Sequence, residues 1–110
     1  MIPEDSQYQV LELIRDKSDL TQREMAQKLG LTLGKTHYSL KALVEAGWIR
    51  AERFARSENK SGYIYVLTPT GVAERLSLAA RLLARKREEF DKLSLEIRAL
   101  EGRLDRDGRS

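Results

Sequence analysis

Residues that could carry out chemistry are few in this chain of 110 residues. The chain has one histidine and no cysteine, so it offers no thiolate nucleophile, no disulfide and no thiolate zinc site. The sequence also lacks a phosphate-binding glycine loop and any group of ligands with metal-binding spacing. We therefore expect neither catalysis nor a bound cofactor. The polar side chains that remain are suited to hydrogen bonding, and their spacing indicates what they bind.

The most informative polar side chains share one face of a predicted helix over about residues 33–46. The face expected to meet a core carries Leu33, Thr36, Leu40, Leu43 and Val44. The opposite face carries Gly34, Lys35, Tyr38, Lys41 and Glu45, with His37 at its margin. A single helix fits the major groove of DNA, where such side chains can reach the edges of the bases. This pattern favours a recognition helix.

Different members of this face suit different contacts. We expect Lys35, His37 and Tyr38 to reach base edges, and Lys41, one turn later, to meet phosphate. Gly34 would let the backbone approach the DNA closely. The predicted DNA contacts from this helix and its cap are Thr32, Gly34, Lys35, His37, Tyr38 and Lys41. His37 taken alone is equally consistent with an ordinary surface residue, whereas a tyrosine on a polar face has no role in a core.

Two shorter helices are expected before the recognition helix. Ser6 is placed to cap a first helix that runs to about Lys17. Thr21 and Glu24 form the pattern of a capping box, which begins a second, short helix. Gly30 is expected to end that helix in a left-handed conformation, and Thr32 to cap the third. Two helices joined by residues 30–32 make a helix-turn-helix.

A β-hairpin is predicted after Gly47, where the hydrophobic period changes to two. The expected strands are residues 48–54 and 63–67, joined by a turn-rich loop over residues 57–62. Trp48 and Leu67 are expected in the core between the hairpin and the helices. The polar tip would act as a wing on the DNA backbone or in the minor groove. Its predicted contact residues are Arg53, Arg56, Ser57, Asn59 and Lys60.

Charge is distributed in agreement with this assignment. The net charge is +3, but residues 1–32 carry six acidic and four basic groups. Residues 33–62 carry six basic and three acidic groups, so the positive excess begins at the recognition helix. A local basic face is what a polyanion binder needs, although charge runs are also common on ordinary solvated surfaces.

One long helix is predicted from Pro69, which follows the capping residue Thr68, to about Gly102. Its length of about 50 Å is too great for it to fold into so small a core. Apolar residues recur at alternating steps of four and three, interrupted only by Lys86. The repeat consists of Val72, Leu76, Ala79, Leu83, Lys86, Phe90, Leu93, Ile97, Leu100 and Leu104. The alternatives are a coiled-coil seam between two copies, which we favour, and a face packed within one chain.

The predicted homodimer is stabilised mainly by Leu76, Leu83, Phe90, Leu93, Ile97 and Leu100. Flanking charges favour an antiparallel pair centred near residues 94–96. In that arrangement Arg87 meets Glu101 of the other copy, whereas a parallel pair would bring Glu96 beside Glu101. The preference amounts to about 1 kcal/mol because such pairs are exposed.

These elements define a mainly α fold with a small β-hairpin. We expect residues 1–68 to form a winged helix-turn-helix DNA-binding domain, and residues 69–110 a long dimerisation helix with a disordered polar tail. The sequence has no apolar run long enough to span a membrane, and residues 1–10 do not have the pattern of a secretion signal. A cytoplasmic location is therefore expected. The other class of protein that fits these elements is an adaptor, in which the winged helix binds protein and the coiled coil recruits a partner.

The segment TQREMAQKLGLTLGKTHYSLKALVEAGWI resembles the helix-turn-helix of MarR-type transcriptional regulators. The stretch NKSGYIYVLTPTG is similar to a small branch linked to exopolysaccharide gene clusters. The resemblance covers residues 6 to about 104, with LGK-x-x-Y and LTP-x-G as its more specific motifs. It implies a homodimeric repressor or activator that binds double-stranded DNA at a palindromic operator. Most MarR-type proteins have a further N-terminal helix that this chain lacks, so we do not carry over their pocket for phenolic ligands, and the effector is unknown.

Overall fold

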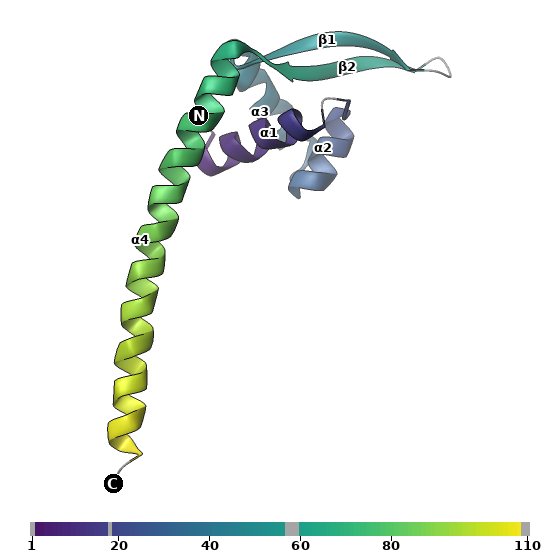
Figure 1. The fold of residues 1–110 in the computed structure, drawn as a ribbon. Coiled ribbons are helices and arrows are strands. Elements are labelled where there is room, and N and C mark those ends of the chain that lie inside the picture. Colours follow the sequence, from purple (N-terminus) through teal and green to yellow (C-terminus); the bar gives the residue numbers. More distant parts are fainter. Residues whose placement is uncertain (1, 18, 57–59, 109–110) are drawn as a thin grey trace. The chain divides into compact units, whose positions relative to one another are not determined.

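The computed structural model describes residues 2–17, 19–56 and 60–108, and the side chains of residues 54–62 lie outside that description. The elements follow the order α1 (Glu4–Asp16), α2 (Gln22–Leu29), α3 (Leu33–Glu45), β1 (Ile49–Arg56), β2 (Lys60–Leu67) and α4 (Pro69–Asp107), shown in Figure 1. The chain divides into two compact units, Met1–Ala79 and Ala80–Ser110. The mainly helical fold with one antiparallel hairpin is the one that the sequence predicts.

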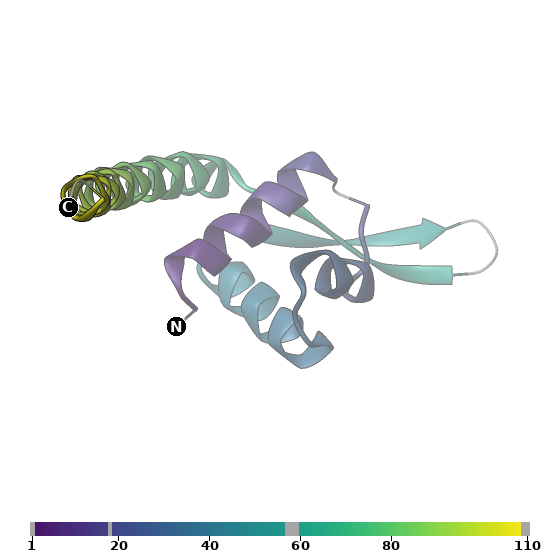
Figure 2. The same cartoon turned by 90° about the horizontal axis from the view of Figure 1, so that it is seen from below.

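One hydrophobic core holds the first unit together. Helices α1, α2 and α3 gather on one side of the hairpin in the two perpendicular views of Figures 1 and 2. The core between these elements consists of Ile2, Val10, Leu11, Ile14, Leu20, Met25, Leu40, Leu43, Ile49, Tyr65 and Leu78. Leu78 belongs to α4, so the first turns of that helix are part of the first unit. Each fully buried aliphatic side chain stabilises the fold by about 1.5–3 kcal/mol relative to an exposed one.

Helix α1 begins three residues earlier than a helix capped by Ser6 would. It starts at Glu4, its N-cap is Pro3, and no side chain caps it, so the prediction of Ser6 as the cap was wrong. Pro3 has a φ of −59°, and Glu4 and Asp5 place negative charge in the first turn. Acidic residues at this end interact favourably with the helix dipole, which stabilises the start without a cap.

The helix-turn-helix ends are where local sequence rules place them. The Thr21 hydroxyl accepts from the Glu24 N–H at 3.1 Å, and the Glu24 carboxylate accepts from the Thr21 N–H at 3.1 Å. Gly30 ends α2 with a φ of +69°, a left-handed conformation that favours glycine. Thr32 caps α3 by accepting from the Lys35 N–H at 3.1 Å. These four predictions are confirmed.

The hairpin is longer than predicted. Its register pairs Ile49 with Leu67 and Arg56 with Lys60, so residues 60–62 belong to β2 and not to a loop. Turn-forming residues can still adopt a strand conformation at these positions, because antiparallel pairing with β1 provides hydrogen-bond partners for their backbone N–H and C=O groups. Trp48 and Leu67 are partly buried and pack against the core, as expected.

Helix α4 runs for 39 residues and passes through Gly102, where the sequence analysis ended it. A glycine inside a helix costs only about 1 kcal/mol relative to alanine, and the good helix formers around Gly102 offset this. The start of the helix is confirmed: the Thr68 hydroxyl accepts from the Gly71 N–H at 3.0 Å, and Pro69 is the first helical residue.

A close backbone contact joins the start of α4 to the end of α3. The Thr68 hydroxyl also donates to the Gly47 carbonyl at 2.6 Å, and the Thr68 N–H donates to the Trp48 carbonyl at 3.0 Å. A Cβ atom on Gly71 would overlap the carbonyl oxygen of Trp48. The motif LTP-x-G therefore has a physical basis: threonine caps the helix and binds residue 47, and glycine leaves room for residue 48.

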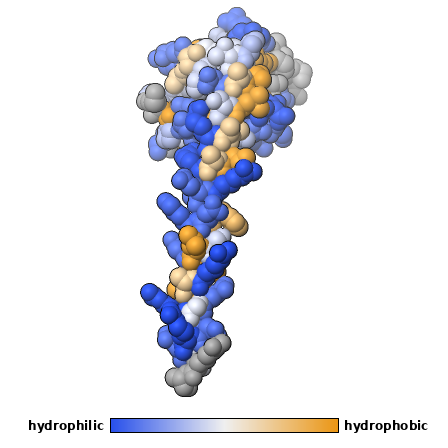
Figure 3. Space-filling model, turned by 60° about the vertical axis from the view of Figure 1, so that its left-hand side comes forward, coloured by the Kyte–Doolittle hydropathy of each residue, from blue (hydrophilic) through white to orange (hydrophobic). Residues whose placement is uncertain are grey.

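The second unit is one stretch of helix whose side chains are almost all exposed. The large apolar ones among them are Leu83, Phe90, Leu93, Leu95, Ile97, Leu100 and Leu104. All except Leu95 belong to the repeat of four and three. In Figure 3 apolar patches recur along this helix between hydrophilic side chains. In the described part of the chain, no helix is both long enough and apolar enough to cross a membrane.

Candidate nucleic-acid interface

Helix α3 presents the predicted reading face to solvent. Gly34, Lys35, His37, Tyr38 and Lys41 are all exposed, and the Tyr38 side chain is 57% exposed. Thr36, Leu40 and Leu43 lie on the other side and are buried. The structure thus brings the predicted contact residues of this helix together on one surface, next to their cap Thr32. The open space at Gly34 leaves the backbone accessible.

The buried face of α3 differs from the predicted one. Leu33 and Val44 were assigned to the core side, but they are 46% and 39% exposed. Both lie on one side of the buried face, which runs through Thr36, Ser39, Leu40 and Leu43 and so is turned around the helix toward Ser39. Ser39, which was not predicted, is buried at 5% exposure. The Thr36 hydroxyl is buried without an energetic penalty because it donates to the Thr32 carbonyl at 2.9 Å.

A polar network that the sequence analysis missed links this face to the hairpin. The amide nitrogen of Gln22 donates to the hydroxyl of Tyr65 at 2.8 Å. The amide oxygen of Gln22 lies 3.3 Å from Nδ1 of His37. Gln22 is the first residue of α2, and nothing in its local sequence distinguishes it from other surface glutamines. Only the packing of α2 against α3 and β2 reveals its role.

The wing is described in part. Arg53 is exposed on β1 and pairs in register with Tyr63, which is 55% exposed. Arg50, also exposed, is paired with Glu52 at 2.6 Å, so its positive charge is largely compensated. Arg56 and Lys60 face each other at the last described pair of the hairpin. The side chains of Arg56 and Lys60 lie outside the description, and so do the predicted contact residues Ser57 and Asn59.

A cleft of about 280 Å³ lies beside the reading face, between α3 and the hairpin. It is lined by Gln22, His37, Leu40, Lys41, Val44, Glu45, Ala51 and Tyr65. Its lining includes both apolar side chains, such as Leu40 and Val44, and all three members of the Gln22 network.

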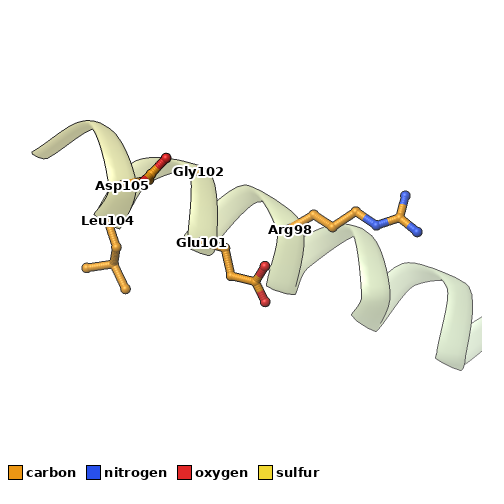
Figure 4. A pocket seen from close by; sticks show the side chains of 5 residues that line it. All are labelled: Arg98, Glu101, Gly102, Leu104 and Asp105. Atoms are coloured by element: carbon orange, nitrogen blue, oxygen red, sulfur yellow. The ribbon is translucent and has the colours of Figure 1, made fainter. Parts of the chain in front are cut away.

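The second unit has a different kind of hollow. In Figure 4 its lining residues all project from α4: Arg98, Glu101, Gly102, Leu104 and Asp105. Because one helix supplies every wall, the hollow is open and lies beside the apolar repeat. Across the described residues, no group of histidine, aspartate and glutamate side chains is arranged to hold a metal ion.

Comparison with known proteins agrees with this geometry. Residues 4–50 match the family described as winged helix-turn-helix DNA-binding. No curated protein sequence matches the chain significantly. The match ends at the start of β1, so it covers the three helices that carry and support the reading face.

Several solved structures share the fold. The apo form of MarR from E. coli is 32% identical, with a TM-score of 0.56 over 66% of this chain and 53% of its own. The regulator PcaV from Streptomyces coelicolor, solved with its natural ligand, is 21% identical, with a TM-score of 0.65 over 91% of this chain and 73% of its own. FabT from Streptococcus pneumoniae, solved with DNA, is 24% identical, with a TM-score of 0.53 over 83% of this chain and 56% of its own.

Fold and site together define a winged helix-turn-helix protein. The structural matches show that the chain shares its fold with E. coli MarR and with PcaV. It spans just over half the length of the E. coli MarR and FabT chains.

Proposed function

We propose that this protein is a transcriptional regulator that binds a specific sequence of double-stranded DNA as a homodimer. Residues 1–68 would bind DNA and residues 69–110 would join the two copies. Two copies related by a twofold axis present two identical reading faces, so the operator would be palindromic. The proposal places the protein in the cytoplasm, with the DNA. The resemblance of the wing stretch extends it to genes of exopolysaccharide synthesis.

The observation that carries the DNA-binding part is the exposed face of α3. Lys35, Tyr38 and Lys41 are exposed on the helix that a helix-turn-helix inserts in the major groove, and Thr36 and Leu40 anchor its other side in the core. Tyr38 has no role in the core that would explain a large aromatic side chain there. FabT, which shares the fold, was solved in complex with DNA.

The dimer part is supported by the exposed apolar repeat of α4. Phe90 is 68% exposed, and Leu93 and Leu100 are 55% and 59% exposed. Leaving such side chains in water costs about 1.5–3 kcal/mol each relative to burial. A second copy supplies the matching repeat that would cover them. A homodimer therefore explains both the spacing of these residues and their exposure.

Selection of bound fragments from a random DNA pool tests the proposal. We expect a palindromic consensus, with affinity for it falling linearly as the logarithm of salt concentration rises. The adaptor hypothesis predicts neither result. A protein that retains no sequence from the pool, or whose binding does not depend on salt, would not be the regulator proposed here.

A further inference from the structure

Gln22 stands where three elements of the first unit meet. It begins α2, and its amide bridges His37 on α3 and Tyr65 on β2, which lie 15 and 43 positions away in the chain. His37 is on the exposed reading face, while Tyr65 is only 7% exposed and belongs to the hydrophobic core. A chain of hydrogen bonds thus leads from the core to the surface proposed to read DNA.

The direction of each bond in this chain follows from the amide. Its nitrogen can only donate and it faces the Tyr65 hydroxyl, so the hydroxyl oxygen accepts. In the amide orientation that the structure has, the oxygen, which can only accept, faces Nδ1 of His37, and in this orientation Nδ1 carries the proton of that bond. A neutral imidazole has one N–H group. With the proton on Nδ1, Nε2 is left as a hydrogen-bond acceptor.

We propose that Gln22 is a positioning residue that holds His37 in its Nδ1–H form, so that Nε2 accepts a hydrogen bond from an exocyclic amino group in the major groove. Adenine and cytosine present such amino groups there, whereas the major-groove groups of guanine that form hydrogen bonds are acceptors. This inference rests on the proposed function, since it specifies what one residue of the reading face recognises. It adds to that function a defined chemical preference at one base.

The surroundings of His37 agree with this role. Its side chain is exposed, and among the described residues the bond to Gln22 is the one hydrogen bond that its ring makes. Nε2 is therefore available to a partner outside the chain. The ring is also fixed, because Gln22 is itself held by a buried tyrosine hydroxyl. A reader whose donor and acceptor atoms are fixed before binding discriminates between bases better than one that adapts to either.

Nitrogen NMR of the imidazole tests the positioning role without DNA. His37 is the only histidine in the chain, so its ring signals are unambiguous. At alkaline pH, where an imidazole is neutral, we expect the wild type to show the Nδ1–H form. Gln22→Met, which cannot accept the bond, should shift the population toward the Nε2–H form that predominates for imidazole side chains in water. Gln22→Glu should keep the Nδ1–H form, because a carboxylate also accepts.

Gln27→Met is the matched control, because it makes the same change at an exposed position of α2 and should leave the tautomer unaltered. It also separates the loss of one hydrogen bond from a general effect on the helix. The positioning role is overturned if the wild type shows the Nε2–H form, or if Gln22→Met leaves the tautomer as it is in the wild type.

DNA selection then tests the preference. Comparing the wild type with His37→Ala identifies the base pair that His37 reads. Each base pair presents one amino group in the major groove, on adenine or on cytosine, so the contact is tested by replacing that base with purine or pyrimidin-2-one, which lack the amino group. Gln22→Met should reduce the preference at that position by roughly fivefold, the usual effect of one hydrogen bond, and leave the other positions unchanged. If removing that amino group weakens the wild type no more than it weakens His37→Ala, the inference is overturned while the proposed function stands. If the wild type selects no sequence, the proposed function fails, and the reading role of His37 fails with it.

Discussion

The two units of this chain differ in the burial of their apolar side chains. In residues 1–79, three helices, a hairpin and the first turns of α4 bury one another's apolar side chains, including Leu11, Met25 and Leu40. In residues 80–110, Leu83, Phe90 and Leu100 are each half or more exposed. The first unit is complete as a single chain. The second has a regular apolar surface, which the proposed dimer would cover.

The first turns of helix α4 carry both kinds of residue: one face is buried in the first unit, and the neighbouring face carries exposed residues of the apolar repeat. Gly71, Arg75 and Leu78 point into the first unit, where the Arg75 guanidinium pairs with the Glu12 carboxylate at 2.8 Å. Val72 and Leu76, each one position further along, are 44% and 58% exposed and belong to the repeat. Adjacent positions in the sequence therefore lie on two different faces of α4, one packed within the chain and the other proposed for dimerisation.

The largest effect is expected from breaking the first unit at its tightest contact. Gly71→Ala places a methyl group on the Trp48 carbonyl, which is backbone and cannot move aside cheaply. We expect the free energy of unfolding, measured by urea denaturation, to fall by about 3 kcal/mol or more. Gly102→Ala is the control, since an added Cβ meets nothing there and should stabilise the helix by up to about 1 kcal/mol. Equal effects at the two glycines would contradict this account of the contact.

The second unit can be tested without disturbing the first. Leu93→Lys removes an apolar residue of the repeat from each copy, which costs about 4 kcal/mol of dimer stability and weakens association on the order of a thousandfold. Sedimentation equilibrium would measure it. Leu95→Lys is the matched control, because Leu95 is similarly exposed but lies off the repeat. If both variants remain dimeric, or both dissociate, the repeat is not the interface.

A third test concerns the exposed face of α3, which is proposed to bind DNA. Tyr38→Ala should cost about 1–3 kcal/mol on the selected operator and little on random DNA, because a base contact carries sequence information. Lys60→Ala should weaken both about equally, as expected for a phosphate contact. Fluorescence anisotropy with the two DNAs measures both variants. A Tyr38→Ala variant that loses affinity equally for both would show that Tyr38 does not read sequence.

The smallest expected effect concerns the direction in which the two α4 helices of the proposed dimer pair. Flanking charges favour the antiparallel arrangement by about 1 kcal/mol. With Leu100→Cys in both copies, a parallel pair brings the two thiols together and they oxidise to a disulfide. In the antiparallel pair residue 100 lies opposite about residue 90, too far from its own copy for a disulfide. We then expect cross-links only in a mixture of Leu100→Cys and Phe90→Cys proteins. Efficient linking of Leu100→Cys alone would establish the parallel arrangement.

Comparison with the sequence predictions shows which features were accessible in advance. The ends of α2 and α3, the exposure of the polar face of α3 and the exposure of the large apolar residues in the α4 repeat were predicted correctly, because each depends on residues within about four positions of one another. Two of the predictions that failed concern burial and strand pairing. Leu33 and Val44 have the right period for a core face, but the buried face of α3 is turned around the helix toward Ser39, which leaves both at its margin. Residues 60–62 have turn composition, yet pairing with β1 draws them into a strand.

The sequence by itself determined the helices, the caps of α2, α3 and α4 and the periodicity of the helix faces, because hydrogen bonds between a cap and its own first turn need no other part of the chain. Only the tertiary structure decided that Gly71 must lack a side chain and that Gln22 joins His37 to Tyr65. Those contacts link residues that are 23, 15 and 43 positions apart. No local pattern encodes them, since they exist only after the hydrophobic core has brought α2, α3 and the hairpin together.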